Sequence, residues 1–236
     1  GVIKRLAMLG SARDHAGWTK YTLFRSAIFL GLSLVLIISL FPPLESLDYV
    51  FYVLQSGFNV APEVFLMVTD LLLLLAGYWL AGSVNGFLLV GSSSYDFFAA
   101  VTSHLGALNR KFNKRGLISL AFAGAIILAW HVPTVLDAAL LSYQLHEIMH
   151  ASVLFSGVMI YVGFRMLSPN MRMLTYLLGC KGMAIFGAVL VVSPVVVYGS
   201  YPFYEQAEAG AAMIAMCIAS DATVIPIWLK RYFAAH

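Results

Sequence analysis

Two histidines one helical turn apart stand out among the residues of this sequence that can do chemistry. The stretch 143–153, YQLHEIMHASV, contains His146, Glu147 and His150 in the spacing His-Glu-x-x-His. Residues four apart on a helix share one face, so both imidazoles can bind the same metal ion. In zinc hydrolases this string supplies two zinc ligands and a glutamate that acts as base on the bound water.

Several features of the sequence argue against a zinc hydrolase. The five-residue string is short and weakly specific, and no second protease motif accompanies it. Glu147 is turned by about 100° from His146 around the helix axis, so the two side chains need not act on one ion. Intramembrane metalloproteases usually supply a later Asp-Gly ligand motif, but here Asp221 is followed by Ala222. We therefore rank zinc, and with it an enzymatic activity, last.

A third histidine and several carboxylates surround the pair. His131 ends one apolar segment, and the pair opens the next after a short connection, which predicts antiparallel neighbours. Ionisable groups inside a membrane are costly and tend to mark function. We predict a metal site made of His131, His146 and His150, with four further residues as candidate ligands or supporting groups: Asp137, Glu147, Glu205 and Glu208.

Three chemistries suit these donors. Imidazoles and carboxylates bind copper, and Met149, Met159 and Met213 nearby are soft enough for Cu(I). A b-type haem is the second alternative, with His131 and either histidine of the pair as axial ligands. In the third, the histidines only form hydrogen bonds, as interfacial polar side chains often do, and the chain is a structural subunit without a metal.

The composition shows what kind of elements must position these residues. The chain has 236 residues, of which 61% are hydrophobic and 11% charged, against about 45–50% and 25% in soluble domains. A membrane span needs about 20 apolar residues. We predict one all-α membrane domain over residues 1–236 with about six spans, at 21–41, 62–90, 116–132, 143–166, 172–197 and 207–229.

Three stretches outside these spans have less regular patterns. Residues 43–61 are mixed and predict an interfacial loop or short helix, while 94–109 have an apolar stripe that predicts an amphipathic helix on the membrane surface, or a short seventh segment. Residues 1–20 lack the apolar core and cleavage site of a signal peptide.

The basic residues predict the orientation in the membrane. The fourteen Lys and Arg residues lie at the N-terminus, in the 110–115 run RKFNKR, near the ends of other spans, or inside spans at Arg25 and Lys181. The loops 42–61, 133–142 and 198–206 contain none. The positive-inside rule then places both termini in the cytoplasm and the histidines at the outer face. Since the basic residues flank spans, we expect contact with anionic lipid and no nucleic-acid partner.

Other charged residues fall within the spans. Lys181 and Asp221 are expected at similar depth on sequential spans, which predicts a structural ion pair. Asp70 lies near the middle of the second span with no evident partner, and His104 falls on the cytoplasmic side. The two cysteines, Cys180 and Cys217, lie in apolar runs and predict packing thiols instead of a disulfide framework.

The stretch 130–165 resembles the CtaG-like family of cytochrome oxidase assembly proteins. The residues that carry the resemblance are Trp130, His131, Pro133, Asp137, Ala138, Leu140, His146 and His150, together with the segment YEQAEAGAAMI at 204–214. The second span lacks the earlier His-x-x-x-His that members of that family usually have. The resemblance implies a prokaryotic plasma-membrane protein that handles copper for a haem–copper oxidase, as assembly factor or accessory subunit, with the terminal oxidase or other subunits of its complex as partners.

Overall fold

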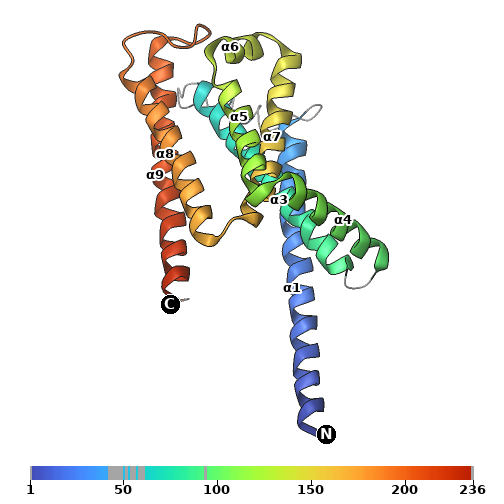
Figure 1. The fold of residues 1–236 in the computed structure, drawn as a ribbon. Coiled ribbons are helices and arrows are strands. Elements are labelled where there is room, and N and C mark those ends of the chain that lie inside the picture. The colour runs from blue at the N-terminus through green and yellow to red at the C-terminus, as the bar shows by residue number, and fades with distance from the viewer. Residues whose placement is uncertain are drawn as a thin grey trace.

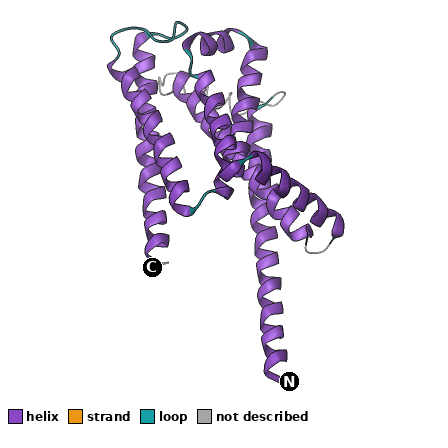
Figure 2. Ribbon diagram, viewed as in Figure 1, coloured by secondary structure: helices purple, strands orange, loops and turns teal. Residues whose placement is uncertain are grey.

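The computed structural model describes residues 2–41, 50, 53, 57, 62–92 and 95–234. These residues form helices joined by turns, and they contain no strand (Figure 2). The elements that follow one another along the chain are α1 (Val2–Leu40), α3 (Pro62–Ser92), α4 (Asp96–Phe112), the short helix η1 (Lys114–Gly116), α5 (Leu117–Trp130), α6 (Pro133–Leu141), α7 (Tyr143–Met166), α8 (Pro169–Val192) and α9 (Phe203–Ala234).

Five of these helices are long and apolar enough to cross a membrane. They are α3, α7, α8, α9 and the part of α1 from Thr19 to Leu40. A sixth crossing exists if α4 and α5, which meet at an angle of 75°, are counted together as one broken span. The predicted all-helical membrane class is therefore confirmed, with five or six candidate spans among the described residues.

The expected third span, 116–132, is shorter in the structure than predicted. Helix α5 has 14 residues, which corresponds to about 21 Å, whereas a bilayer core is about 30 Å thick. The preceding α4 has no buried residue and exposes a row of apolar side chains that includes Phe97, Leu105 and Leu108. Its position agrees with the amphipathic helix predicted at 94–109.

The corner between α4 and α5 is built by an asparagine and two left-handed residues. Arg115 and Gly116 have φ of 54° and 76°, so both break the helical path. The buried Asn113 accepts a hydrogen bond from the Ser119 backbone N–H (3.1 Å) and donates one to the Ser119 hydroxyl (2.7 Å). These bonds start α5 in its new direction. A Cβ on Gly116 would collide with the backbone of Gly163 in α7, so this close approach also needs glycine.

The boundaries of the last two spans also differ from the prediction. The fifth span was expected to reach residue 197, but α8 ends at Val192 because Pro194 disfavours helical geometry at the residue before it. Residues 193–202 form an irregular loop, and α9 then begins at Phe203, before the predicted 207. The expected 133–142 loop contains the nine-residue helix α6. The prediction for 43–61 lies almost entirely outside the described residues.

The helices pack as two groups that meet at one end. Helix α3 packs against α1 and α7, α5 packs against α7, and α8 pairs with α9, which also touches α3 (Figure 1). The α8–α9 pair is close because Gly187 and Gly210 face each other: a Cβ on Gly187 would lie 2.6 Å from the carbonyl oxygen of Gly210. Small residues of this kind let membrane helices approach closely.

The ends of the helices fall into two sets. In Figure 1 the chain termini both lie at the end away from α6, and α1 extends beyond the other helices at that end. Helix α6, the 193–202 loop and the first turn of α7 lie together at the opposite end. All three predicted metal-binding histidines belong to this second end, which is called the α6 end below.

Candidate functional site

The first turns of α7 bring His146 and His150 together. Ser142 caps the helix by accepting a hydrogen bond from the Leu145 backbone N–H (3.4 Å), which fixes where the helix begins. The two imidazole centroids are 4.3 Å apart, with their planes inclined at 63°. The two imidazoles therefore share one helical face in the structure, as their spacing predicted.

The His150 imidazole is in an unusual environment. The residue is 1% exposed, and neither ring nitrogen has a hydrogen-bond partner among the described residues. The ring lies edge-on to Phe41, with the centroids 6.2 Å apart. A buried polar group without a partner costs about 1–3 kcal/mol. A neutral imidazole with a free lone pair on one ring nitrogen is the form that binds metal ions.

His131 ends α5 and is oriented by its own helix. Its Nδ1 donates to the carbonyl oxygen of Ile127 (2.7 Å), so the proton is on Nδ1 and the lone pair is on Nε2. The ring lies edge-on to Phe186 of α8, with the centroids 5.6 Å apart. A backbone carbonyl that holds one ring nitrogen is the usual arrangement behind a metal-binding histidine, because it fixes the tautomer and the ring orientation.

The full predicted ligand set is not gathered into one group. Within the described part of the chain, no three His, Cys, Asp or Glu residues lie close enough together to hold a metal ion. The sequence predicts a tight hairpin between His131 and His146, but the connection is a separate helix, α6, which begins at Pro133. The metal site of seven residues stays a prediction, and the structure brings together only the His146–His150 pair.

Asp137, one of the candidate ligands, has a structural role in the described fold. Its carboxylate oxygens accept hydrogen bonds of 3.1 Å from the backbone N–H groups of Gly199 and Ser200, so it ties α6 to the 193–202 loop. Desolvation raises the pKa of Asp137, but the hydrogen bonds from Ser200 and Gly199 outweigh it and hold the pKa below its ordinary value.

The loop is also held by a residue that the sequence argument did not select. The Gln206 side chain is buried at the start of α9, accepts from the Val197 backbone N–H (2.7 Å) and donates to the carbonyl oxygen of Tyr201 (3.3 Å). The Tyr198 hydroxyl donates to the backbone carbonyl of His131 (3.0 Å). Burial, with a smaller effect from Asp137, raises the pKa of Tyr198 to about 12, so the hydroxyl remains a donor. The sequence does contain one signal for the role of Gln206, which is a polar residue at the start of an apolar helix next to a loop.

The other candidate carboxylates lie near this end without forming a ligand group. Glu147 and Glu205 are half-buried, and Glu208 is exposed. None belongs to a three-residue metal-binding group within the described ranges. The low rank of zinc among the candidate metals therefore stays a prediction.

A cavity of about 50 Å³ lies where six helices and a loop meet at the α6 end. Its walls come from α3, α5, α6, α7, α8, α9 and the 193–202 loop, and they include Asp70, His131 and Gln206. The Oδ1 atom of Asp70 is buried and has no hydrogen-bond partner among the described residues. This volume suits a single ion or a few water molecules. The haem alternative stays a prediction.

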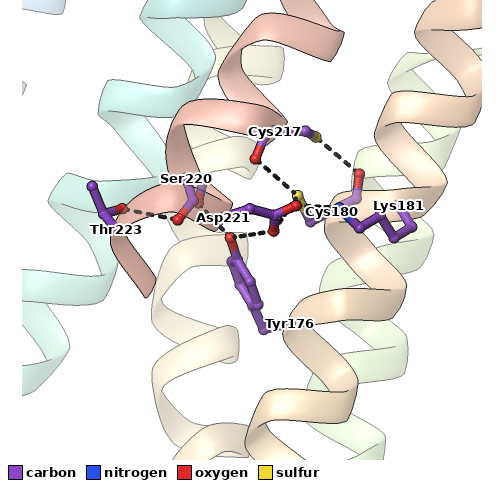
Figure 3. Close-up of polar contacts among 7 residues, drawn as sticks. All are labelled: Tyr176, Cys180, Lys181, Cys217, Ser220, Asp221 and Thr223. Carbon is purple, nitrogen blue, oxygen red and sulfur yellow. Dashed lines mark hydrogen bonds and ion pairs between the residues drawn. The ribbon is translucent and has the colours of Figure 1, made fainter. Parts of the chain in front are cut away.

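A second polar cluster joins α8 to α9 (Figure 3). Lys181 forms an ion pair with Asp221. Asp221 also accepts a hydrogen bond from the Tyr176 hydroxyl (3.1 Å). The Cys217 thiol donates to the carbonyl of Cys180 (2.9 Å), so both cysteines are free thiols that serve helix packing. The cluster contains a cation that neutralises the aspartate, which leaves no charge there to attract a metal ion.

Comparison with known protein families decides the relationship that the motifs suggested. Residues 6–233 match the family described as cytochrome c oxidase caa3 assembly factor (Caa3_CtaG). The chain belongs to this family. The match covers nearly the whole chain, whereas the motifs in the sequence covered about a third of it. No curated protein and no solved structure matches the chain.

The motif residues of this assembly-factor family member converge in the structure. Trp130, His131, Gln206 and Met213 were separated into two stretches of the sequence, and all four line the same cavity. Trp130 also donates from Nε1 to the Ser152 hydroxyl of α7 (2.6 Å). These four residues, from the two stretches that carried the resemblance, are therefore grouped around one place at the α6 end.

Proposed function

We propose that this assembly factor handles copper for a haem–copper oxidase, binding the ion at the His146–His150 pair and passing it to an oxidase subunit. The observation that carries the proposal is the His150 imidazole, which is buried with two unpartnered ring nitrogens and lies 4.3 Å from a second imidazole. A copper ion would satisfy the nitrogen that otherwise costs free energy in an apolar environment.

The small number of ligands favours transfer over storage. Structural zinc sites are usually closed by four protein ligands, whereas catalytic sites keep an open position. The described residues supply two imidazoles in close contact and no third ligand of the His, Cys, Asp or Glu type within reach. An ion held by two protein donors can be passed to a partner that offers more.

The charge distribution supports an outer location for the pair. Helix α6 and the 193–202 loop contain no Lys or Arg, while Arg110, Lys111, Lys114 and Arg115 lie at the α4–α5 corner at the other end. The positive-inside rule then puts the corner and both termini in the cytoplasm of a prokaryote and the histidine pair at the outer face of the plasma membrane.

The proposal is tested by copper loading of the oxidase in cells. His146→Gln combined with His150→Gln removes both imidazoles, and we expect the purified oxidase to contain at least about tenfold less copper. His104→Gln on α4 is the matched control, because this histidine is exposed, makes its own-helix contact with Ala100 and lies on a different helix from the pair. The control should leave oxidase copper unchanged.

Two accompanying measurements make the result decisive. Thermal unfolding of the detergent-purified double variant verifies that the fold survives, since replacing a buried ring can leave a void. Metal analysis of wild type after incubation with copper alone measures whether the pair takes up the ion. A folded double variant that supports normal copper content in the oxidase would overturn the proposal.

A further inference from the structure

The cavity at the α6 end has a donor set that differs from the histidine pair. Three methionines from three different helices line it, Met67 of α3, Met149 of α7 and Met213 of α9, together with His131 and Asp70. Met149 is 0% exposed and Met213 is 5% exposed, so both thioethers are covered by protein. Thioethers are soft ligands that select Cu(I) over harder divalent ions.

We propose that this cavity is a second copper site, which binds Cu(I) through the three methionine thioethers and His131, with Asp70 as the balancing charge. The inference rests on the proposed copper handling and assigns it an oxidation state and a second location. Met67 and Asp70 lie outside the stretches that carried the family resemblance. Met149 lies within one of these stretches, between the two histidines, but is not one of the motif residues.

The charge of the cavity matches a monovalent cation. Asp70 is the carboxylate among the lining residues, and no Lys or Arg lines the cavity. Its Oδ1 atom is buried without a hydrogen-bond partner in the described structure. A buried carboxylate is retained where a cation or a hydrogen-bond donor compensates it. One Cu(I) ion and one carboxylate sum to zero, whereas a divalent ion would leave a positive charge in apolar surroundings.

His131 is prepared for the same ion. Because Nδ1 donates to the carbonyl oxygen of Ile127, the lone pair is on Nε2. The backbone of His131 is held in turn by the Tyr198 hydroxyl at 3.0 Å. These contacts fix the imidazole before any ion arrives, which lowers the cost of ordering a ligand on binding.

The size of the cavity agrees with an ion. A volume of about 50 Å³ holds one ion or a few water molecules. Water would be the occupant of a purely structural cavity, bridging Asp70 to Gln206 and the loop tyrosines. The methionines distinguish the two occupants, because thioethers bind Cu(I) and are poor hydrogen-bond partners for water.

The experiment measures Cu(I) affinity of the full-length protein in detergent, under anaerobic conditions, by competition with a chromophoric Cu(I) chelator. The test variant combines Met67→Leu, Met149→Leu and Met213→Leu, since Leu conserves volume and is well tolerated in place of Met. We expect affinity to fall at least about tenfold and the copper–sulfur signal in the X-ray absorption spectrum to disappear. Asp70→Asn should also weaken binding at least about tenfold.

A matched control uses methionines that do not line the cavity. Met166→Leu of α7, Met173→Leu of α8 and Met216→Leu of α9 change the same number of thioethers, two of them on helices that also line the cavity with a methionine. This control should keep wild-type affinity and the copper–sulfur signal. Thermal unfolding of both triple variants checks that each is folded. If the cavity triple variant does not fold, the affinity measurement uses the single Met213→Leu variant instead.

The outcomes separate this proposal from the copper handling by the histidine pair. Wild-type affinity in the cavity variant, or no Cu(I) binding by wild type, would overturn the cavity site, and the oxidase copper content of the histidine variants would then still decide the proposed function. Cu(I) binding that survives in the His146→Gln and His150→Gln double variant but is lost in the methionine variant would support the cavity site even if the histidine pair proves dispensable.

Discussion

Trp130 at the end of α5 donates a hydrogen bond of 2.6 Å from its indole Nε1 to the hydroxyl of Ser152 in α7. The Ser152 hydroxyl donates onward to the backbone carbonyl of Met149 (2.8 Å), so both groups are satisfied. This contact joins the helix that ends in His131 to the helix that carries His150. This contact explains why the Trp-His dipeptide and the His-x-x-x-His string lie in the same region of the molecule.

The Trp130–Ser152 bond should contribute measurably to stability. We expect a double-mutant cycle with Trp130→Phe, Ser152→Ala and the double variant to give a coupling of about 0.5–1.5 kcal/mol, the range of a net hydrogen bond. Reversible unfolding in mixed detergents supplies the four free energies of unfolding. The cycle cancels the loss of ring volume in Trp130→Phe, so additive single effects would show that the contact does not stabilise the fold.

The hydrogen bonds from the 193–202 loop to the Asp137 carboxylate should weaken in acid. The pKa of the Asp137 carboxyl is lowered in the folded state from its ordinary 3.8. A lowered folded-state pKa means that the ionised form contributes stability above the ordinary value and loses it as the pH falls through the folded value. We expect the Gly199 and Ser200 amides, corrected for intrinsic exchange, to lose protection below about pH 4.

A charge-removing variant tests the cause of that acid response. Asp137→Asn should reduce protection of the same two amides already at pH 7 and remove most of the acid dependence. Asp96→Asn, at the first turn of α4, changes an aspartate on another helix and should reproduce the wild-type profile. Acid dependence that persists in Asp137→Asn would assign the response to a different group.

The close approach of α8 and α9 should make the stability of the protein sensitive to substitution of one glycine of α8 and insensitive to substitution of another. A Cβ on Gly187 would lie 2.6 Å from the carbonyl oxygen of Gly210, whereas a Cβ on Gly182 would meet nothing within 4 Å. We expect Gly187→Ala to destabilise the protein by about 1–3 kcal/mol through overpacking. Gly182→Ala should be neutral or slightly stabilising, since Ala favours helix over Gly. Equal unfolding midpoints for the two variants would contradict this packing.

Removing one charge of the Lys181–Asp221 pair should destabilise the protein more than removing both charges. Lys181→Met leaves the aspartate without its cation, and Asp221→Leu leaves the lysine without its anion, while the double variant leaves neither charge. Because the Lys181 side chain is 53% exposed and that of Asp221 only 18%, Lys181→Met should lower the unfolding midpoint most. A double variant less stable than either single variant would be the opposite result.

Membrane sidedness can be read from cysteine labelling. In a Cys180→Ala and Cys217→Ala background, Ser200→Cys in the loop and Ser103→Cys on α4 place exposed thiols at the two ends of the helices. A membrane-impermeant maleimide added to intact cells should label the first, and should reach the second only after the membrane is opened. Labelling in the reverse pattern would place the histidine pair in the cytoplasm.

Local features were predictable from the sequence because they depend on residues close together along the chain. The fourth span was expected at 143–166, and α7 has these bounds. The pairing of His146 with His150 follows from helix geometry alone, whatever the rest of the chain does. The ends of α5 and α8 were less predictable, because an apolar segment can continue past the point where Arg115 and Gly116 turn the chain or where Pro194 stops a helix.

The sequence by itself determined a helical membrane protein, its basic and non-basic ends, its resemblance to an oxidase assembly family and a pair of imidazoles on one helical face. Only the tertiary structure decided that Asp137 and Gln206 hold a loop, and that Asp70, His131 and three methionines share one cavity. The reason is that periodicity fixes which face of a helix a residue occupies, whereas the neighbour of that face is chosen by long-range packing at positions such as Gly187 and Gly210.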